Sequence, residues 1–356
     1  MATTFKTLLN NDVTTTRTLL HEAIPVTGTI VSGTYAADGN IKNYSHGMFQ
    51  SVYDYPYLSS SANHIFDITF GYSSLSSLSS STSTQNSKKV NIYNQMAQVL
   101  MGHDQNGNIQ NFDQDGNLAA GGTKIHEAVF INVARLLTKD EIKKGSFQVT
   151  VLTGSSPLTP TDSLTISDYG ATTSYKINSP AGEYGILYTS SATPGSDSGV
   201  GLLYYQAGVA VLTASVFSNA PGGTSAEWCG FGPPANYKAG TEDGIQASLT
   251  GSQISSSADG LRNRMQNLQF NNTTELNSTI YFCRANHNDF NYSSNPTYLT
   301  SSKMVVKESS TDSPVTYITT IGLYSADNEL LAVAKLSEPV KKSPDTEVTF
   351  RTRLDY

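Results

Sequence analysis

Charged residues are scarce in this chain of 356 residues. Asp, Glu, Lys and Arg together make up 14% of the sequence, whereas ~25% is usual for globular proteins. Acidic residues outnumber basic ones, which gives a net charge of −7. The densest basic spots are only pairs, at 88–89, 143–144 and 341–342. Because phosphate binding requires clustered Lys and Arg side chains, we expect no nucleic acid partner.

Cysteines and long apolar runs are also scarce. Cys229 and Cys283 have no metal-ligand spacing, and they form either one disulfide bond or, as we favour, two buried thiols. No apolar stretch reaches the ~18 residues of a membrane-spanning helix. The nearest one, 201–217, contains Gln206 and Gly208 and fits buried strands better. The N-terminus lacks a basic segment followed by an apolar one, so we expect no signal peptide.

Hydroxyl and aromatic side chains are abundant instead, with 20 Tyr against 13 Phe. Many hydroxyls, many rings and few charges fit extended strands joined by polar turns. We therefore predict a mainly β fold of several small sandwich-like or barrel-like subdomains, with a few short helices. At ~100–200 residues per domain the length suggests two or three domains. We place an N-terminal β-rich domain at 1–155, with a serine-rich surface loop at 73–87, a turn-rich β region at 156–255 and a C-terminal domain at 256–356.

Hydrophobic spacing predicts individual elements. Alternating or β-branched residues predict strands at 64–72, 146–152 and 278–285. Helical spacing predicts a helix at 90–102, ended by a glycine, and another segment at 257–270.

A further short helix is predicted within 136–145. Thr138 and Glu141 form a capping-box pattern there, and Gly145 follows two lysines.

The last forty residues carry the clearest pattern. Strands are predicted at 314–325 and 330–336, with a turn between them. From 348 to 356 apolar residues alternate strictly with polar ones. We therefore expect Phe350, Leu354 and Tyr356 to share a buried face, with the arginines at 351 and 353 on the other.

One segment resembles the start of a calcium loop. Asn111, Asp113 and Asp115 occupy alternate positions before Gly116, so their oxygens could converge on a hard cation. The twelfth position is Gly122, however, where such a loop needs a bidentate Glu. We interpret 104–117 as two successive tight turns and predict no metal site.

No catalytic motif is complete. His126-Glu127 lacks the second His of a zinc protease helix, because Phe130 occupies that position. No nucleophile elbow or phosphate-binding loop is present. The acids at 242–243 and at Asp289 are interpreted as solvated loop residues. We therefore expect no enzyme activity, no catalytic residue and no cofactor.

Two clusters of rings leave a sugar-binding role open. They lie at 54–58 and 228–237, each together with Pro. Core or interface packing is the favoured interpretation, because aromatic side chains dominate buried contacts.

The C-terminal region resembles a known phage module. VTYITTIGLYSADNELLAVAKLSEPVKK (315–342) is similar to the "IGLYD-x-DGELIAVAKLPE" stretch in the N-terminal module of tail-collar fibre proteins of contractile-tailed phages. Most of the chain also resembles virion structural proteins of marine and cyanobacterial myoviruses. The segments that carry this second resemblance are SVYDYPYLSSSANHIFDITFGYS, EAVFINVARLLTKDEIKKGSFQVT, SPAGEYGILYTSS, GLLYYQAGVAVLTASVF and FNYSSNPTYL.

These resemblances imply a virion protein of the tail or baseplate that is present in multiple copies and connects other tail proteins or fibres. A fibre would continue beyond the collar-type stretch, so an adaptor that docks through 256–356 is the favoured form. A neck, collar or capsid-associated component and a carbohydrate-binding receptor module remain the alternatives. The residues expected to make the docking contacts are Tyr317, Ile321, Leu323, Tyr324, Phe350, Leu354 and Tyr356.

Overall fold

A computed structural model of the chain divides into two compact units. The central unit comprises Leu20–Thr274, and the terminal unit comprises Met1–Leu19 together with Glu275–Tyr356. The structure describes residues 5–25, 38–80, 84–118, 122–153, 162–189, 199–217, 258, 261–262, 264–293, 299–300, 303–304, 309, 311 and 313–356. The expected boundary at 155/156 falls between two strands that pair with each other, and the one at 255/256 lies outside the described residues.

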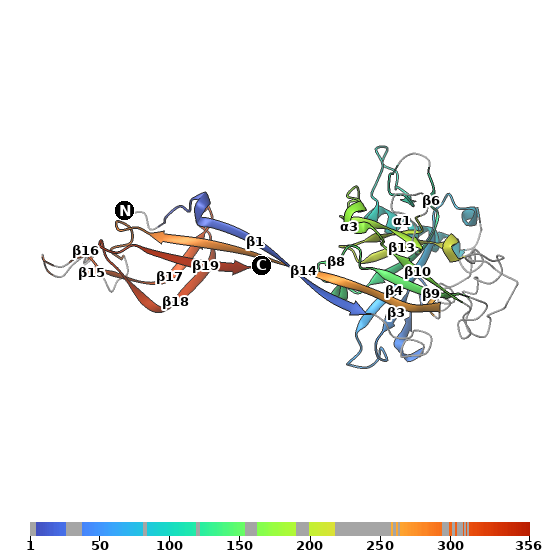
Figure 1. Ribbon diagram of the computed structural model, residues 1–356, viewed down its shortest axis with the longest axis horizontal. Coiled ribbons are helices and arrows are strands. Elements are labelled where there is room, and N and C mark those ends of the chain that lie inside the picture. The colour runs from blue at the N-terminus through green and yellow to red at the C-terminus, as the bar shows by residue number, and fades with distance from the viewer. Residues whose placement is uncertain are drawn as a thin grey trace. The chain divides into compact units, whose positions relative to one another are not determined.

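The central unit is built on antiparallel strands (Figure 1). Its strands are β2 (Ile41–Asn43), β3 (Gln50–Tyr53), β4 (His64–Tyr72), β5 (Phe112–Asp113), β6 (Lys124–Ile125), β7 (Glu127–Val133), β8 (Glu141–Ile142), β9 (Gln148–Thr153), β10 (Asp162–Ser167), β11 (Tyr184–Thr189), β12 (Gly201–Tyr204) and β13 (Val209–Thr213). Hydrogen bonds join them in the order β9-β10-β11-β12-β13-β7-β4-β3-β2, while β5 and β6 form a separate pair. The helices are α1 (Thr84–Leu100), α2 (Arg135–Thr138) and α3 (Ala171–Ser174).

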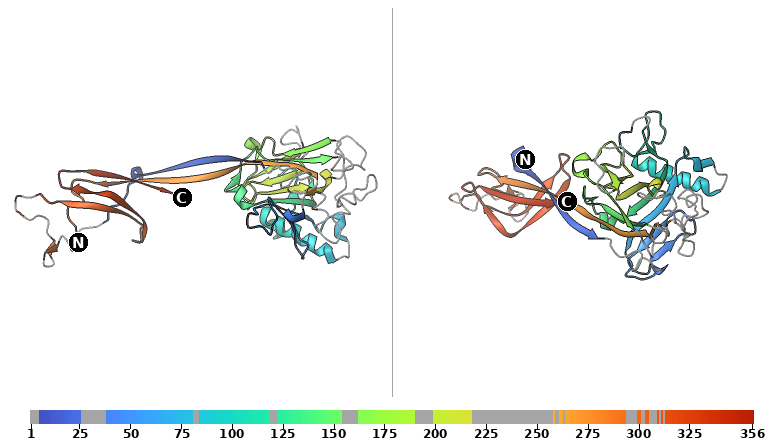
Figure 2. Two further views of the ribbon diagram at one scale, coloured as in Figure 1. Left: turned by 90° about the horizontal axis from the view of Figure 1, so that it is seen from below. Right: turned by 45° about the vertical axis from the view of Figure 1, so that its right-hand side comes forward.

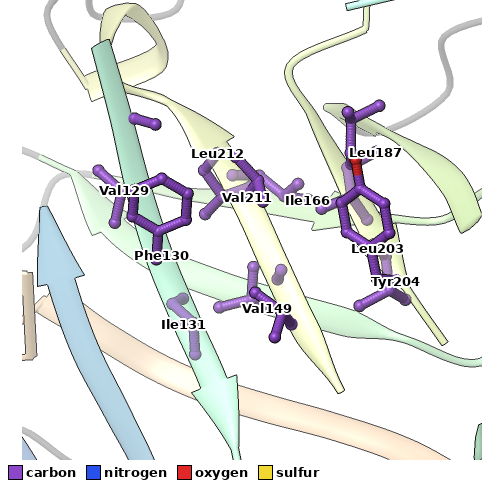
Figure 3. Close-up of a cluster of buried hydrophobic side chains, with 14 of the residues drawn as sticks. Val129, Phe130, Ile131, Val149, Ile166, Leu187, Leu203, Tyr204, Val211 and Leu212 are labelled. Atoms are coloured by element: carbon purple, nitrogen blue, oxygen red, sulfur yellow. The ribbon is translucent and has the colours of Figure 1, made fainter. Parts of the chain in front are cut away.

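The middle strands of this sheet are buried on both faces. Every residue from Ala128 to Ile131 in β7 is buried, and so is every residue of β13. Figure 3 shows Val149 of β9 and Ile166 of β10 among side chains of β7, β12 and β13. The continuous apolar runs therefore reflect strands with no solvent-facing side.

Helix α1 lies close against β4 because the strand presents a glycine. A Cβ atom on Gly71 would stand 2.8 Å from the carbonyl oxygen of Lys89 and 2.9 Å from the backbone nitrogen of Tyr93. The ring of Tyr93 is buried and contacts that of Phe112 edge-on at 5.4 Å. This contact packs α1 against the buried ring of Phe112.

The terminal unit is a small β structure. Strands β1 (Val13–Pro25) and β14 (Met265–Ala285) are hydrogen-bonded neighbours that contribute residues to both units (Figure 2). In the terminal unit β14 also pairs with β19 (Val348–Asp355). Strands β17 (Thr316–Tyr324) and β18 (Leu330–Lys342) form an antiparallel hairpin, and β15 (Leu299–Thr300) pairs with β16 (Lys303–Met304).

The mainly β fold with a few short helices is confirmed. The strands expected at 64–72, 146–152, 278–285 and in the last forty residues are present, and so is the helix expected at 90–102, which begins earlier. Among the described residues, none of the helices has the length and apolarity needed to cross a membrane.

The helix expected within 136–145 is wrong in its position. Helix α2 ends at Thr138, and Lys139 follows with a φ of 56°. Ile142 lies in β8, where it is buried and pairs with Asn272 of β14. Pairing with a strand more than a hundred residues away therefore overrides the local capping-box pattern.

The helical interpretation of 257–270 is confirmed for the residues described between 258 and 264, which are helical, and is wrong from Met265 on. Met265 and Leu268 are both buried but belong to β14, where a register shift between Met265 and Asn267 puts a helix-like spacing on a strand. The surface loop expected at 73–87 is also corrected. Within the serine tract, Ser76 is buried and its hydroxyl donates to Glu127 at 2.8 Å. Helix α1 begins at Thr84, inside the segment expected to be a loop.

Candidate interaction surface

The described residues of the terminal unit form almost no hydrophobic core. Ala285 is the one hydrophobic side chain classed as buried among its described residues. The others that are buried there are polar: Asp12, Ser278, Thr279, Thr316, Lys342, Ser343 and Thr352. An isolated two-stranded hairpin is marginally stable in water, so a hairpin with so little burial benefits from further contacts.

The structure separates the seven expected docking residues into two groups. Ile321, Leu323, Phe350 and Leu354 are half-buried and pack within the unit. Three tyrosines project into solvent, with exposed fractions of 51% at Tyr317, 46% at Tyr324 and 74% at Tyr356. The first group is therefore partly covered within the unit. The second leaves much of each ring exposed, although Tyr324 contacts the ring of Phe5 and the hydroxyl of Tyr356 is hydrogen-bonded to that of Thr279.

The expectation that Tyr356 shares the buried face of β19 is wrong. The alternation holds through β19, with Thr352 buried and Arg351 and Arg353 exposed. Tyr356 follows the last residue of that strand. Its backbone N–H donates to the carbonyl of Asn277 at 2.8 Å, while its ring stays outside.

An apolar patch lies on the outer face of the β17–β18 hairpin. We define the hairpin patch as Tyr324, Leu330, Leu331 and Val333, which are 46%, 53%, 68% and 53% exposed. The ring of Tyr324 lies across Gly322, where an added Cβ would meet it at 2.8 Å. Clustered exposed apolar side chains of this kind are a feature of surfaces that bind other proteins.

Charged and polar groups surround the exposed side chain of Tyr356. A cleft of about 180 Å³ is lined by Thr15, Thr16, Arg17, Asn277, Ser278 and Tyr356. Arg17 pairs with Glu275, and Arg353 donates to Asp355 at 2.7 Å and to Ser278 at 3.0 Å. In each pair the two charges compensate each other, so the surroundings of Tyr356 are polar without a strong charge of one sign.

A buried lysine fastens the end of the hairpin. The ammonium of Lys342 donates to the carbonyls of His287 (3.2 Å) and Ser343 (2.9 Å) and to the side-chain oxygen of Asn291 (2.7 Å). Burial lowers the pKa of this lysine. The sequence offered no sign of this role, because a pair of lysines in a strand usually faces solvent.

In the calcium-like segment the acidic side chains bond with other groups of the protein. Asp113 is buried and pairs with the ammonium of Lys124, and burial raises the pKa of its carboxyl group. Asp115 accepts the backbone N–H of Asn117 at 3.1 Å, and Gly116 has a φ of 67°. These are contacts of tight turns, as the sequence predicted. No group of three His, Cys, Asp or Glu side chains in the described parts of the chain is arranged to hold a metal ion.

Among the described residues, the remaining candidates are engaged separately in contacts within the protein. Asp289 pairs with Lys6 at 2.5 Å, and this hydrogen bond lowers the pKa of its carboxyl group. Cys283 is half-buried in β14, and burial raises the pKa of its thiol. Cys229, the rings at 228–237 and the acids at 242–243 lie outside the described residues.

Sequence reasoning missed the leucines and the valine of the hairpin patch, which it interpreted only as strand residues. The two consecutive leucines at 330–331 were the available signal, because they directly follow a polar turn and cannot both face inward on a regular strand. Comparison of the chain with models of protein families, with curated proteins and with solved structures gives no match.

Proposed function

We propose that this chain is a structural component of a contractile-tailed phage particle, located in the tail or baseplate, where it joins other tail proteins or fibres. The observation that carries the proposal is the surface of the terminal unit. Its hairpin leaves Tyr324, Leu331 and Val333 exposed although the described residues of the unit bury almost no hydrophobic side chain. A surface of this composition suits a protein that is completed by its neighbours in an assembly.

The sequence resemblance supports the same region. Residues 315–342, which resemble the collar-type stretch, form β17, the turn and β18. The hairpin patch and the exposed Tyr317 belong to this segment. We assign the contact with neighbouring virion proteins to this hairpin and to Tyr356. We assign the chain no catalytic activity.

The test introduces charge into the hairpin patch without touching the interior of the unit. The variant Leu331→Glu/Val333→Glu changes two exposed positions on β18. The matched control is Gln95→Glu/Gln98→Glu, which adds the same charge at exposed positions on α1 of the central unit. Each variant is supplied to a phage that lacks the wild-type gene, and the chain is quantified in purified particles by mass spectrometry.

We expect the control to enter particles at the wild-type level and the hairpin variant to be excluded, because glutamates in a dry contact carry a large desolvation cost. Equal melting midpoints of the two purified variants establish that exclusion does not come from unfolding. Normal incorporation of the hairpin variant contradicts docking through the patch. Absence of the wild-type chain from particles contradicts the proposed function itself.

A further inference from the structure

A row of polar side chains crosses the outer strands of the central sheet. The strand register sets Lys42 of β2 opposite Ser51 of β3, Ser51 opposite Asp67 of β4, and Asp67 opposite Asn132 of β7. Directly opposed residues of antiparallel strands lie on the same face of the sheet. Gly71 lies four residues after Asp67 on β4, so the two residues lie on the same face of the sheet. At Gly71 this face is covered by α1. The polar row therefore occupies the part of this face beside the helix.

Two groups of aromatic rings lie beside this row. In one group Tyr44 stacks on His46 at 5.2 Å and contacts Phe49 at 4.6 Å. In the other group Tyr53 contacts Tyr57 at 6.3 Å and His64 at 5.4 Å.

Lys42 lies close to one ring of each group. Its ammonium lies 4.9 Å from the centre of the Tyr44 ring and 5.9 Å from that of Tyr57. The aromatic-polar cluster consists of Lys42, Tyr44, His46, Phe49, Ser51, Tyr53, Tyr57, His64 and Asp67.

The centre of the cluster is a carboxylate with one oxygen available. The Oδ1 atom of Asp67 accepts hydrogen bonds from Ser51 at 2.5 Å and from His64 at 2.8 Å. No donor among the described residues reaches its Oδ2 atom. The hydrogen bond to Asp67 raises the pKa of His64, which favours the imidazolium form beside the carboxylate.

The rings of the cluster are not part of the core. His46 is exposed, Tyr57 is 37% exposed, and Tyr44, Phe49 and Tyr53 are half-buried. Neighbouring Tyr55 is 56% exposed. Rings that only filled the core would be covered, as Tyr93 is. In the aromatic-polar cluster, by contrast, several partly exposed rings lie beside the polar row.

We infer that the aromatic-polar cluster binds a neutral hexopyranose unit of a polysaccharide. The C–H face of a pyranose ring packs on an exposed tyrosine ring, which offers apolar area in a rigid frame. Vicinal hydroxyls of the sugar donate to the available oxygen of Asp67, while Lys42 donates to sugar oxygens. The available oxygen of Asp67 needs a hydroxyl donor, which an ionised carboxylate or phosphate does not supply, and the polar row disfavours a purely apolar ligand. The inference does not depend on the proposed role in the particle.

The test measures binding of simple sugars to the full-length chain. Methyl glucopyranoside, galactopyranoside and mannopyranoside are titrated by saturation-transfer NMR against the wild type and three variants. Tyr57→Ala removes a stacking ring, and Asp67→Asn removes the charge of the central acceptor. Tyr169→Ala is the matched control, because Tyr169 is 56% exposed and stands outside the cluster.

We expect at least one glycoside to bind the wild type, and Asp67→Asn to weaken that affinity about tenfold, the equivalent of one charge-assisted hydrogen bond. Tyr57→Ala also weakens binding, and Tyr169→Ala leaves it unchanged. Because Tyr57 is exposed, its variant remains informative if Asp67→Asn lowers the melting midpoint. Absence of binding by all three glycosides, or equal binding by the wild type, Tyr57→Ala and Asp67→Asn, overturns the inference.

Discussion

The hydroxyl of Tyr205 donates a 3.1 Å hydrogen bond to the Oδ2 atom of Asp168, and both side chains are buried in the central unit. The same carboxylate accepts the backbone N–H groups of Gly145 at 2.7 Å and Phe147 at 3.0 Å. It therefore holds the turn before β9 against the residue that follows β12. Burial raises the pKa of Asp168 to about 6, in spite of these three donors.

This raised pKa predicts how stability depends on pH. The folded state binds the proton more tightly than the unfolded state, where an Asp has a pKa near ~3.9. The contribution of Asp168 to stability is therefore fully present below pH ~4 and is lost as the pH rises to about 6, by ~3 kcal/mol for a difference of ~2 units. Urea unfolding of the wild type and Asp168→Asn at several pH values measures the difference, which should shrink with rising pH over this window. A difference that is independent of pH would show that Asp168 ionises normally.

The contact between Gly71 and α1 predicts the effect of one added methyl group. Gly71→Ala places a Cβ against the backbone at Lys89 and Tyr93, which cannot move without shifting the helix. Overpacking of this kind typically costs ~1–3 kcal/mol. Gly39→Ala is the control, because its Cβ would meet Pro56 at an ordinary 3.6 Å. Chemical denaturation should separate the two variants, and equal midpoints would mean that α1 does not pack as closely as described.

The pair of Asp113 and Lys124 predicts that calcium has no effect on stability. The ammonium already compensates the buried carboxylate, so the melting midpoint should be the same with calcium and with chelator. Lys124→Met leaves that charge unpaired and should cost ~3–5 kcal/mol, whereas Asp113→Asn/Lys124→Met should recover much of the loss. A calcium-dependent rise that disappears in Asp113→Ala and in Asp115→Ala would instead establish an ion site.

Lys342 predicts a weak point that is confined to the terminal unit. Lys342→Met removes three hydrogen bonds and leaves the acceptors of His287, Asn291 and Ser343 without this donor. The carbonyls of His287 and Ser343 keep other donors, from Asn291 and Thr346, so the loss is that of hydrogen bonds from a charged donor, each of which contributes ~1.5–3 kcal/mol. Hydrogen exchange should therefore accelerate in β17 and β18, while β7 and β13 keep wild-type protection. Unchanged hydrogen exchange in β17 and β18 would show that Lys342 does not stabilise the hairpin.

Strands were predictable where one face is buried and the other is wet. The alternation of β19 is visible in the sequence because covered positions alternate there with exposed ones. The alternation of β4 was visible too, although most of that strand is buried. The same reasoning failed at Met265 and Leu268, since a bulge in β14 gives buried positions a helical spacing. It failed at Glu141 because the partner of β8 lies in β14, more than a hundred residues away.

The candidate sites were less predictable than the fold. The segment proposed for docking was chosen from its strand pattern and its resemblance, but the division into half-buried and exposed residues depends on which face of the hairpin meets solvent. Lys42, Ser51 and Asp67 come together only through the register of three strands. The sequence spacing of these three residues does not indicate that they lie in one row.

Locating the chain in purified particles tests the central claim most directly. Antibodies against the central unit, viewed by immunogold electron microscopy on intact phage, should label a fixed position on the tail or baseplate, with several copies per particle. Label at the neck or on the capsid would support a structural role in the particle but contradict a position in the tail or baseplate. Particles that carry no label and contain no peptide of the chain by mass spectrometry would contradict the account.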